Sequence, residues 1–600
     1  MDFVWCLLCF LFLFVPEIYS ECPDMCSCSI QNLLCETGRI VDLGPLLRSV
    51  DEGIQSIRIT APKNRPNELQ LGPLFQDFKN LRSITITHSQ IPAIGPGVFI
   101  GMVRVRKLDL SWNDITALKI EAFKGLYDLK ELYLDHNKIE SIPSAGFRNV
   151  HNLEVLDLSY NKLKELVTRM LFLLQRLQHL NLSGNPLGRL DPEILKDVQA
   201  LKRLECRDCR IDAFPPELSQ LLPSLTVLDL GKNRIPLLDP SHLRNLVNLK
   251  ELYLDGNFLR ELQAYTFSGL YLNTLSLSRN EFKGSLPRHT FFNCSVRHLD
   301  LSYNRLRNVD NKFFRPIRNN LLSLNISGNH LSNANLKKVI PPLIHLRRLE
   351  LSNMRLDDLA DETLRGLDHL TRLNLSHNDF QHVPYTLQYV MGSLDSLDIS
   401  YNRIEGLTSE MSLELSLTRF KSVVLEGNPW VCDACGHARL KNVINMTRQR
   451  ELCPADRRCV TCASPNEAQG FGVGLYSVPE GIEDCGLDDR SSKLLLSRPT
   501  YLGILLGCAA LVALCVVALL AAIMYNARHS ARYYTHEDQG GRLSEEEAFL
   551  YPSSDYYITE KKPSVATIED YSRDPLIPHT HAHSSKPTVG VVTTVPPRRC

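Results

Sequence analysis

The sequence has no excess of either charge, because 67 Lys and Arg residues balance 67 Asp and Glu residues over 600 positions. This balance gives no support to a nucleic acid or a strongly acidic partner. The sequence also lacks a nucleophile–base motif, a metalloprotease helix and a nucleotide-binding loop. The glycines around Gly470 do not supply such a loop, since they follow no predicted strand and open no predicted helix. We therefore expect no enzymatic activity and no cofactor.

What the sequence has in abundance is one repeated phrase, whose clearest copies begin at Leu225 and Leu249 and read L-x-x-L-x-L-x-x-N-x-L. The alternating leucines indicate a short strand with one apolar face, which only stacked neighbours can cover. The ninth position, here called the ladder position, carries an asparagine that can satisfy backbone groups in the turn. Ladder positions fall every 24 residues and then continue with small slips: Asn113, Asn137, Asn161, Asn185, Cys209, Asn233 and Asn257, then Asn280, Asn304, Asn329, Met354, Asn378, Asn402 and Asn428.

This phrase is the signature of a leucine-rich repeat and resembles the extracellular class with 24-residue repeats. The resemblance implies an α/β solenoid, a horseshoe of about 15–16 repeats over residues 54–428 with parallel strands on its concave face. Such a scaffold offers a long protein-binding surface and no closed pocket. We expect a second core row on the convex side, about ten residues after the ladder position, from Phe123, Phe147, Leu195, Leu243, Phe267, Phe314 and Leu364.

The first 20 residues predict a secretory signal peptide. An apolar run from Phe3 to Val15 is too short to cross a bilayer comfortably, and cleavage is expected near Ser20–Glu21. No Lys or Arg precedes the run, which departs from the usual pattern, and an uncleaved anchor is the alternative. Export would place the following cysteines in an oxidising compartment.

Residues 21–53 predict an N-terminal cysteine cap, with spacing C-x3-C-x-C-x6-C from Cys22 to Cys35. The first strand of a solenoid exposes an apolar edge that needs such a cap. A zinc site is the competing use of four cysteines, but secretion favours disulfides, and the spacing alone leaves three pairings open. The spacing resembles the N-terminal flanking domain of extracellular leucine-rich repeat proteins. That resemblance implies the pairs Cys22–Cys28 and Cys26–Cys35.

Residues 429–487 follow Asn428-Pro429-Trp430 and resemble the C-terminal flanking domain of the same proteins. That domain usually opens with C-x-C and has four cysteines, whereas this one opens with C-x-x-C and has six, which allow fifteen pairings. The family phrase C-x-x-P-x4-G fits the segment that begins at Cys462. The pairs that this resemblance implies are Cys432–Cys462 and Cys435–Cys485, with Cys453–Cys459 as an extra bridge.

Three cysteines lie within the repeats. Cys206 occupies an inward leucine position and Cys209 a ladder position, and we interpret both as free cysteines substituted into the core rather than as a redox pair. Cys294 has no evident partner. Thirteen cysteines lie between the predicted signal and the predicted membrane span, so at least one thiol is free or pairs between chains.

Residues 488–499 are read as a juxtamembrane linker and residues 500–525 as a transmembrane helix, because about 24 uncharged residues reach roughly 36 Å. Arg528 and Arg532 follow as a positive-inside flank, which predicts a type I protein of the plasma membrane with its N-terminus outside. Residues 526–600 predict a disordered cytoplasmic tail that is too short for a kinase or a Toll-type domain. Its tyrosines could recruit an adaptor when phosphorylated, or could simply be solvated: Tyr551, Tyr556, Tyr557 and Tyr571.

Five Asn-x-Ser/Thr sequons predict N-glycosylation, at Asn181, Asn293, Asn325, Asn374 and Asn445. Three of them occupy the fifth repeat position and face out from the concave sheet. The strands between Asn181 and Asn325 carry no sequon there, which leaves a window for a ligand. Its candidate binding residues are Arg203, Glu205, Asp229, Tyr253, Ser276, His298 and Asp300. The alternative is that these charges only neutralise each other across strands.

The caps, repeats, single span and short tail together are similar to arthropod adhesion proteins of the capricious/tartan type. This resemblance implies a cell-surface receptor or adhesion molecule that recognises a cell-borne or secreted protein. Two other functions stay open: an innate-immune co-receptor, and a regulator that sequesters a secreted growth factor.

Overall fold

The structure is a computed structural model that describes residues 22–284, 286–418, 420–446, 460–464, 473–475 and 514–525. The predicted signal peptide, linker and tail, with most of the predicted span, lie outside these residues. The chain divides into two compact units, Met1–Lys493 and Leu494–Cys600.

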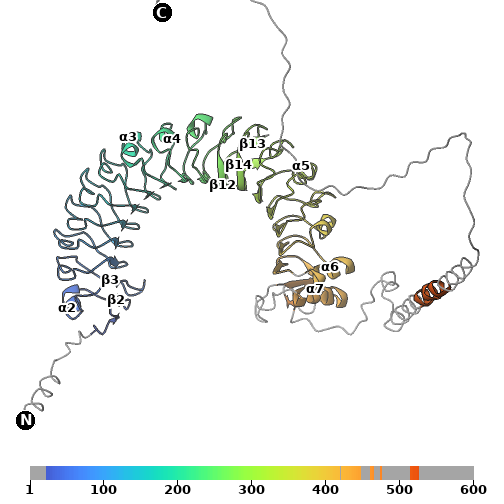
Figure 1. Cartoon of the computed structure of the whole chain (residues 1–600), viewed down its shortest axis with the longest axis horizontal. Helices are drawn as coiled ribbons and strands as arrows, with labels where there is room; N and C mark the ends of the chain where they lie inside the picture. The colour runs from blue at the N-terminus through green and yellow to red at the C-terminus, as the bar shows by residue number, and fades with distance from the viewer. Residues whose placement is uncertain are drawn as a thin grey trace, which may run out of the picture. The chain divides into compact units, whose positions relative to one another are not determined.

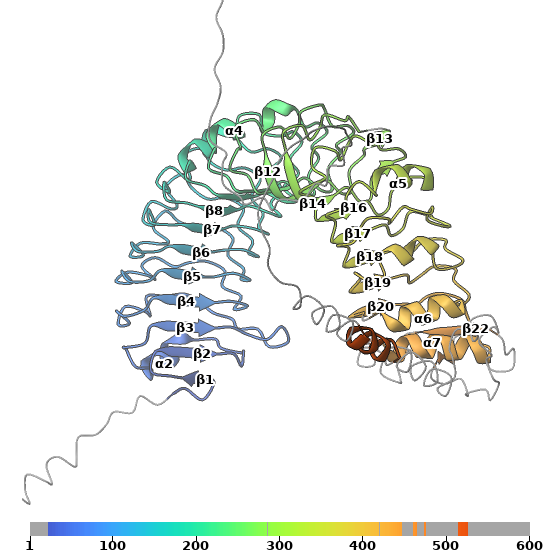
Figure 2. The same ribbon diagram turned by 45° about the vertical axis from the view of Figure 1, so that its right-hand side comes forward.

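The first unit is built on one 18-stranded sheet in which successive repeats supply successive strands (Figures 1 and 2). Its strands are β1 (Cys26–Cys28), β2 (Asn32–Cys35), β3 (Ser56–Ile59), β4 (Ser83–Ile86), β5 (Lys107–Asp109), β6 (Glu131–Tyr133), β7 (Val155–Asp157), β8 (His179–Asn181), β9 (Arg203–Glu205), β10 (Val227–Asp229), β11 (Glu251–Tyr253), β12 (Tyr271–Ser276), β14 (Ser295–Asp300), β16 (Ser323–Asn325), β17 (Arg348–Glu350), β18 (Arg372–Asn374), β19 (Ser396–Asp398) and β20 (Ser422–Val424). The strands line the concave side of this unit (Figure 1).

Every neighbouring pair from β2 to β20 is parallel, and only β1 runs antiparallel, to β2. The repeats are stacked in register, so that Leu204, Leu228 and Leu252 are direct partners on β9, β10 and β11. Without the two cap strands β1 and β2, the sheet holds sixteen strands, which agrees with the number expected from the repeats. The parallel solenoid predicted from the leucine spacing is therefore present.

Short elements connect the strands on the other side. The helices are α2 (Leu43–Arg48), α3 (Pro192–Leu195), η1 (Lys196–Val198), α4 (Leu218–Leu221), η2 (Pro240–His242), α5 (Asn333–Val339), η3 (Tyr385–Tyr389), α6 (Ser409–Leu417) and α7 (Ala434–Met446). Side chains before α2, α3, α5 and α6 cap these helices by accepting backbone N–H groups, as expected for short polar residues. Two small sheets complete the unit: β13 (Lys283–Gly284) with β15 (Arg305–Leu306), and β21 (Trp430–Val431) with β22 (Thr461–Ser464) and β23 (Val473–Gly474).

The ladder asparagines bridge neighbouring repeats with both ends of their amides. The Asn137 Nδ2 group donates to the carbonyl of Leu110 in the previous repeat at 3.0 Å and to that of Leu134 in its own repeat at 3.0 Å. Its Oδ1 atom accepts the N–H of Ile115 at 3.0 Å. The same geometry recurs at later ladder asparagines, such as Asn233 and Asn378. The prediction that this residue satisfies turn backbone is confirmed.

The convex core row is also present. All seven predicted side chains are at most 3% exposed. Phe123 and Phe147 stack with ring centroids 6.1 Å apart, and Phe267 continues onto Phe291 at 5.4 Å. Each repeat thus closes its core between a strand leucine and a convex apolar side chain.

The residue before each ladder position takes a left-handed backbone conformation. Four aromatic residues in this row, His88, Trp112, His136 and Tyr160, have φ between 52° and 57°. Their rings stack along the solenoid, and Trp112 lies 5.3 Å from His88 and 3.8 Å from His136. The stack ends at Gly184, where a Cβ would lie 2.7 Å from the Tyr160 ring.

Disulfides close both ends of the solenoid. Cys22 is bonded to Cys28 and Cys26 to Cys35, the two pairs that the family resemblance implied. At the other end Cys432 is bonded to Cys462, again as implied. Cys435 is also disulfide-bonded. Its expected partner Cys485, and the expected pair Cys453–Cys459, lie outside the described residues.

Trp430 anchors the C-terminal cap. Its ring is fully buried, and its Nε1 group donates to the Leu425 carbonyl at 2.9 Å. Nearby, the Ser412 hydroxyl of α6 donates to the Arg439 carbonyl of α7 at 3.2 Å. The cap helix α7 is therefore hydrogen-bonded to α6, the helix that precedes the last strand β20.

The interpretation of Cys206 and Cys209 as unbonded core residues is wrong, because the structure joins them by a disulfide. Both are fully buried, as expected for core positions. In the ladder geometry the ninth side chain lies over the sixth, as the hydrogen bond from Asn137 to Leu134 shows. Two cysteines at these positions have Cα atoms 5.5 Å apart, within the usual range for a disulfide. Cys294 is buried and unbonded among the described residues.

The second unit is described only at residues 514–525, which form a helix. Its apolar side chains are exposed, with Leu519 at 63% and Ile523 at 59%. Among the described residues, no helix has both the length and the apolar character needed to cross a membrane.

Candidate ligand-binding surface

The seven candidate window residues come together on five neighbouring strands of the concave face. Because buried leucines alternate with exposed residues along each strand, the third and fifth repeat positions share the outer face. The fifth positions of β9, β10, β11, β12 and β14 are direct partners and form a row: Glu205, Asp229, Tyr253, Ser276 and Asp300. Arg203 and His298 occupy third positions at the two ends. The window lies between Asn181 on β8 and Asn325 on β16.

Glu205 is held by two basic neighbours. The Arg203 Nε group donates to its carboxylate at 2.8 Å, and the Nε2 atom of His179, on the next strand, lies 3.0 Å from its other oxygen. Burial alone would raise the pKa of this carboxyl, but the two hydrogen bonds outweigh burial and lower the pKa of Glu205 below its usual value. This end of the window is a neutralised cluster.

Arg207 bridges two carboxylates of successive repeats, Asp229 on β10 and Asp255 in the turn after β11. Its Nη1 atom lies 3.1 Å from Asp229 and 3.1 Å from Asp255, and its Nη2 atom also contacts Asp255. The guanidinium fits because Gly231 stands between them, and a Cβ there would lie 2.2 Å from Nη1. Burial raises the pKa of Asp229, although the Gly231 N–H and Arg207 oppose this rise.

His179, Arg207 and Asp255 were not predicted, because the prediction used only the second, third and fifth repeat positions within the window. Gly231 was the available signal, since a glycine at the seventh position leaves room for a long neighbouring side chain. The contacts support the alternative of internal neutralisation for Glu205 and Asp229. They arise within one strand, diagonally between the neighbouring strands β8 and β9, and through the seventh positions, rather than between directly opposed residues.

The other half of the window contains no ion pair among the described residues. The Tyr253 hydroxyl donates to Glu251 at 3.0 Å, and burial raises the pKa of Tyr253. Ser276 is 9% exposed and forms the floor. His298 and Asp300 have no ionic partner among the described residues, and Asp300 accepts the Ser302 N–H at 2.8 Å. These two side chains are the most available for an incoming polar group.

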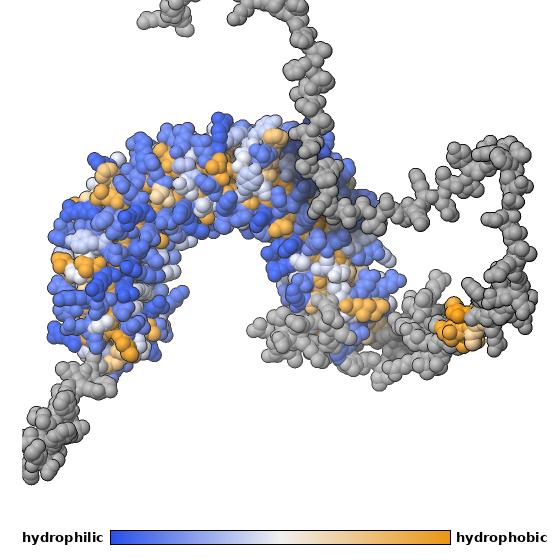
Figure 3. All heavy atoms as spheres, viewed as in Figure 1, coloured by the Kyte–Doolittle hydropathy of each residue, from blue (hydrophilic) through white to orange (hydrophobic). Residues whose placement is uncertain are grey.

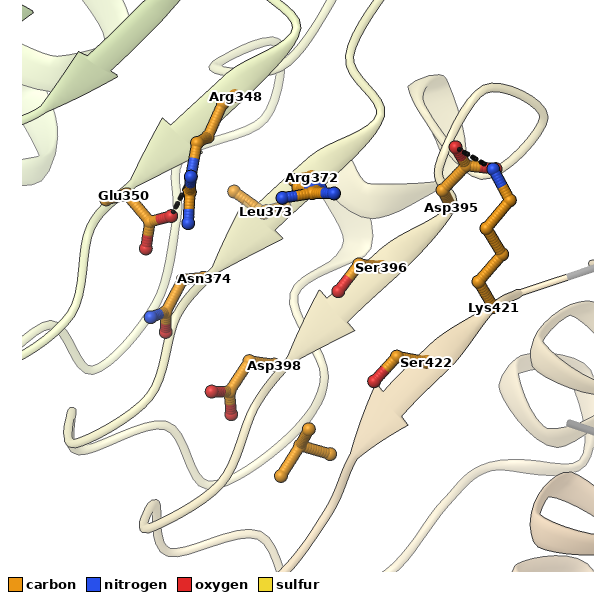
Figure 4. A pocket seen from close by; sticks show the side chains of 11 residues that line it. Arg348, Glu350, Arg372, Leu373, Asn374, Asp395, Ser396, Asp398, Lys421 and Ser422 are labelled. Carbon is orange, nitrogen blue, oxygen red and sulfur yellow. Dashed lines mark hydrogen bonds and ion pairs between the residues drawn. The ribbon is translucent and has the colours of Figure 1, made fainter. Parts of the chain in front are cut away.

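A second feature, a hollow of about 330 Å³, lies over β17–β20 (Figure 4). Arg348 is bonded to Glu350 at 2.7 Å on one side, and Lys421 to Asp395 at 2.9 Å on the other. The repeat pattern does not predict this hollow. The lining is completed by Arg372, Leu373, Asn374, Ser396, Asp398, Ser422 and Val424.

The sequons occupy different environments. Asn181, Asn325 and Asn374 lie half-buried on the concave sheet, whereas Asn293 is exposed in a loop. The side chain of Asn445 and the candidate phosphotyrosines lie outside the described residues. Hydrophilic residues dominate the face drawn in Figure 3, with apolar residues in small separate groups. The visible surface therefore suits polar recognition.

Comparison with protein families matches the family described as Leucine rich repeat at residues 72–115, 128–187, 199–259, 247–306 and 344–404. Leucine-rich repeat-containing protein 3B of Danio rerio is 34% identical over 116 residues, which cover 19% of this chain and 42% of that protein. Trophoblast glycoprotein of Mus musculus is 25% identical over 329 residues, 49% of this chain and 73% of that protein. Tsukushi of Gallus gallus is 30% identical over 197 residues, 28% and 52% of the two chains.

Among solved structures, a leucine-rich repeat protein of Leptospira interrogans aligns with a TM-score of 0.50 and 21% identity. The alignment covers 66% of this chain and 90% of that one. The chain spans less than half of the zebrafish relative and about half of the chicken one. In its repeat spacing, its asparagine ladder and the residues that the family model matches, the chain is similar to leucine-rich repeat proteins, and it shares their solenoid fold.

Proposed function

We propose that this protein is a cell-surface receptor or adhesion molecule that binds a protein partner on its concave face. The observation that carries the proposal is the row of polar side chains at the window. Glu205, Asp229, Tyr253, Ser276 and Asp300 lie in register on one open sheet face between two sequons. Tyr253 and Arg203 are of residue types that are enriched at protein interfaces, and the acidic and hydroxyl groups beside them are typical of the polar rim.

The proposed topology is a type I protein of the plasma membrane, with the repeats outside and residues 526–600 inside. It is supported by the apolar run Phe3–Val15, by the disulfides of both caps and by the uncharged residues 500–525. The tail, under this proposal, acts through adaptors that bind its phosphorylated tyrosines.

The size of the window limits how the partner binds. Six strand steps of roughly 4.8 Å give a width of about 29 Å, and the exposed strand depth is about 17 Å. The resulting area of about 500 Å² is below the roughly 800 Å² per partner of a standard interface. The partner therefore uses flanking loops as well, or binds weakly.

The class of partner is tested by displaying the full chain on cells and probing it with other cells, a panel of tagged extracellular proteins and microbial polymers. Binding of a cell-borne protein supports the proposal. Selective binding of microbial polymers would make the chain an immune co-receptor, and capture of a secreted growth factor without cell adhesion would make it a sequestering regulator.

The position of the site is tested with glycan wedges. Ser276→Asn and Asp300→Asn each write an Asn-Leu-Ser sequon into the window, and Asp157→Asn writes the same sequon beside Asn181 as the control. With glycan occupancy shown by mass, the protein identified by the panel should lose binding at least tenfold to the first two variants and none to the third. Full binding by both window variants would place the site elsewhere.

A further inference from the structure

The hollow over β17–β20 arises from a change in side-chain size along the sheet. Its third positions are in register across the four strands and run from two arginines to two serines: Arg348, Arg372, Ser396 and Ser422. The short serines leave open space between Arg372 and Lys421 (Figure 4). The hollow in the concave face thus follows from which side chains occupy the third repeat positions.

The lining is neutral overall but rich in hydrogen-bonding groups. Three basic residues, Arg348, Arg372 and Lys421, face three acidic ones. Two of the basic residues are already in ion pairs. The acidic residues are Glu350, Asp395 and Asp398.

Several of these groups are unused. The Arg372 guanidinium and the Ser396 and Ser422 hydroxyls make no hydrogen bond or ion pair with any residue in the described part of the chain, and no line joins them in Figure 4. An ion would be attracted by one half of the balanced lining and repelled by the other. A neutral group with many hydroxyls can use donors and acceptors together, so the hollow fits a sugar better than an ion.

A sugar attachment point lies in the lining itself. Asn374 begins the sequon Asn374-Leu375-Ser376. Its Oδ1 atom accepts the Ser376 N–H at 2.9 Å, which orients the amide, and its Nδ2 group has no partner among the described residues. At Asn181, by contrast, the Nδ2 group donates to Asp157 at 3.0 Å. The nitrogen that a glycan would use is therefore free at Asn374.

We propose that this hollow seats the first N-acetylglucosamine of a glycan on Asn374. A lipid-linked oligosaccharide pyrophosphate supplies the sugar: its C1–O bond breaks, the Nδ2–C1 bond forms, and the amide proton and the lipid pyrophosphate leave. Arg372, Ser396 and Ser422 donate to the sugar oxygens, and Asp398 accepts from a hydroxyl. The seated glycan covers β17–β20 and leaves the window as the open part of the concave face. This inference rests on the proposed extracellular placement.

The test measures how fast each glycan is removed from the native full chain made in glycosylating cells. Peptide N-glycosidase acts on the folded protein, and mass spectrometry follows Asn293, Asn325 and Asn374 separately. Asn325 is the matched control, because it occupies the same repeat position on β16 but does not line the hollow. We expect release at Asn374 to be at least tenfold slower than at Asn325, and Asn293 to be fastest.

Two variants tie the protection to the lining. Arg372→Ala alone, and Ser396→Ala with Ser422→Ala, should each bring release at Asn374 close to the rate at Asn325 without changing the rate at Asn293. Equal rates at Asn374 and Asn325 in the unmodified chain would overturn the proposal, as would unchanged protection in both variants.

The remaining outcomes separate this inference from the proposed function. A bare Asn374 beside a glycosylated Asn293 would overturn the seat while leaving the extracellular placement intact. No glycan at any of the three sites would overturn both. If the bare hollow bound added free chitobiose, it would be a site for a partner's sugar, and the attachment proposed here would be wrong.

Discussion

Each ladder asparagine supplies hydrogen bonds to the backbone of the turn. The turn needs them because it lies beyond the short strands and has no strand pairing of its own. The amide of Asn137 joins three carbonyls and one N–H across two repeats, and the residue is 7% exposed. Buried groups left without partners cost about 1–3 kcal/mol each. The residue is therefore a main source of the precise turn geometry.

Asn137→Ala should lower the free energy of unfolding by about 3 kcal/mol, because it leaves these buried backbone groups without hydrogen-bond partners. The control is Asn152→Ala, which removes only an exposed hydrogen bond to the Tyr127 carbonyl and should cost less than about 1 kcal/mol. Chemical denaturation followed by circular dichroism measures both. Equal losses would show that the ladder amide does not carry the turn.

The lowered pKa of Glu205 predicts a pH-dependent contribution to stability. A carboxyl whose folded pKa is below its unfolded value stabilises the fold above the unfolded pKa, near 4.3, and loses this effect as pH falls through the folded pKa. Glu205→Gln should therefore be less stable than the unchanged chain at pH 7, and the difference should shrink progressively as the pH falls below the unfolded pKa. Glu165→Gln, at an exposed position, should show no such convergence in unfolding curves measured across this range.

At the scale of the element, the sequence predicts the strand and its partners well. The leucine spacing gives the register directly, because each buried leucine must meet its equivalent in the next repeat. Contacts made by side chains at the seventh position were not predicted. Arg207 reaches Asp229 and Asp255 through the space at Gly231, and the alternation of residues along a strand does not predict such a contact. The hollow is missed for a similar reason, since it depends on side-chain size across four strands.

The Cys206–Cys209 disulfide occupies the place of a ladder amide, and this predicts an exchange. Cys206→Leu with Cys209→Asn restores the common repeat and should keep the stability within about 1 kcal/mol, because ladder hydrogen bonds replace the bridge. The double variant Cys206→Ala with Cys209→Ala has neither the disulfide nor the ladder hydrogen bonds, and its free energy of unfolding should fall by about 3 kcal/mol or more. Thermal unfolding of the two double variants compares them. If both lost the same stability, the bridge would have a role unrelated to the ladder.

At the scale of the whole molecule, each repeat of the first unit contacts its neighbours, so its stability is carried from strand to strand and depends on closed ends. The caps were predictable in outline from cysteine spacing, and the two N-terminal pairs agree with the family resemblance. The position of a ligand-binding site was not predictable, because the leucines that specify the fold face inward and do not determine which residues lie on the outer surface.

Cys26→Ala with Cys35→Ala should open the N-terminal end locally. Losing such a bridge costs about 2–5 kcal/mol, and the nearest-neighbour architecture confines the effect to adjacent strands. Hydrogen exchange should accelerate at β2, β3 and β4 and stay unchanged at β10 and β11. Uniform acceleration along the sheet would mean that the solenoid unfolds as one cooperative unit.

The two ends of the solenoid also differ in the exposure of their tryptophans, which can be measured by fluorescence. The chain has three tryptophans, of which Trp5 lies in the predicted signal peptide. Trp112 is 46% exposed and lies between two histidine rings near the N-terminal end, while Trp430 is fully buried in the C-terminal cap. Iodide should quench the fluorescence of Trp112 and spare that of Trp430, whose emission should shift to longer wavelength only when its cap opens. The loosening of each end can therefore be followed separately in the unlabelled protein.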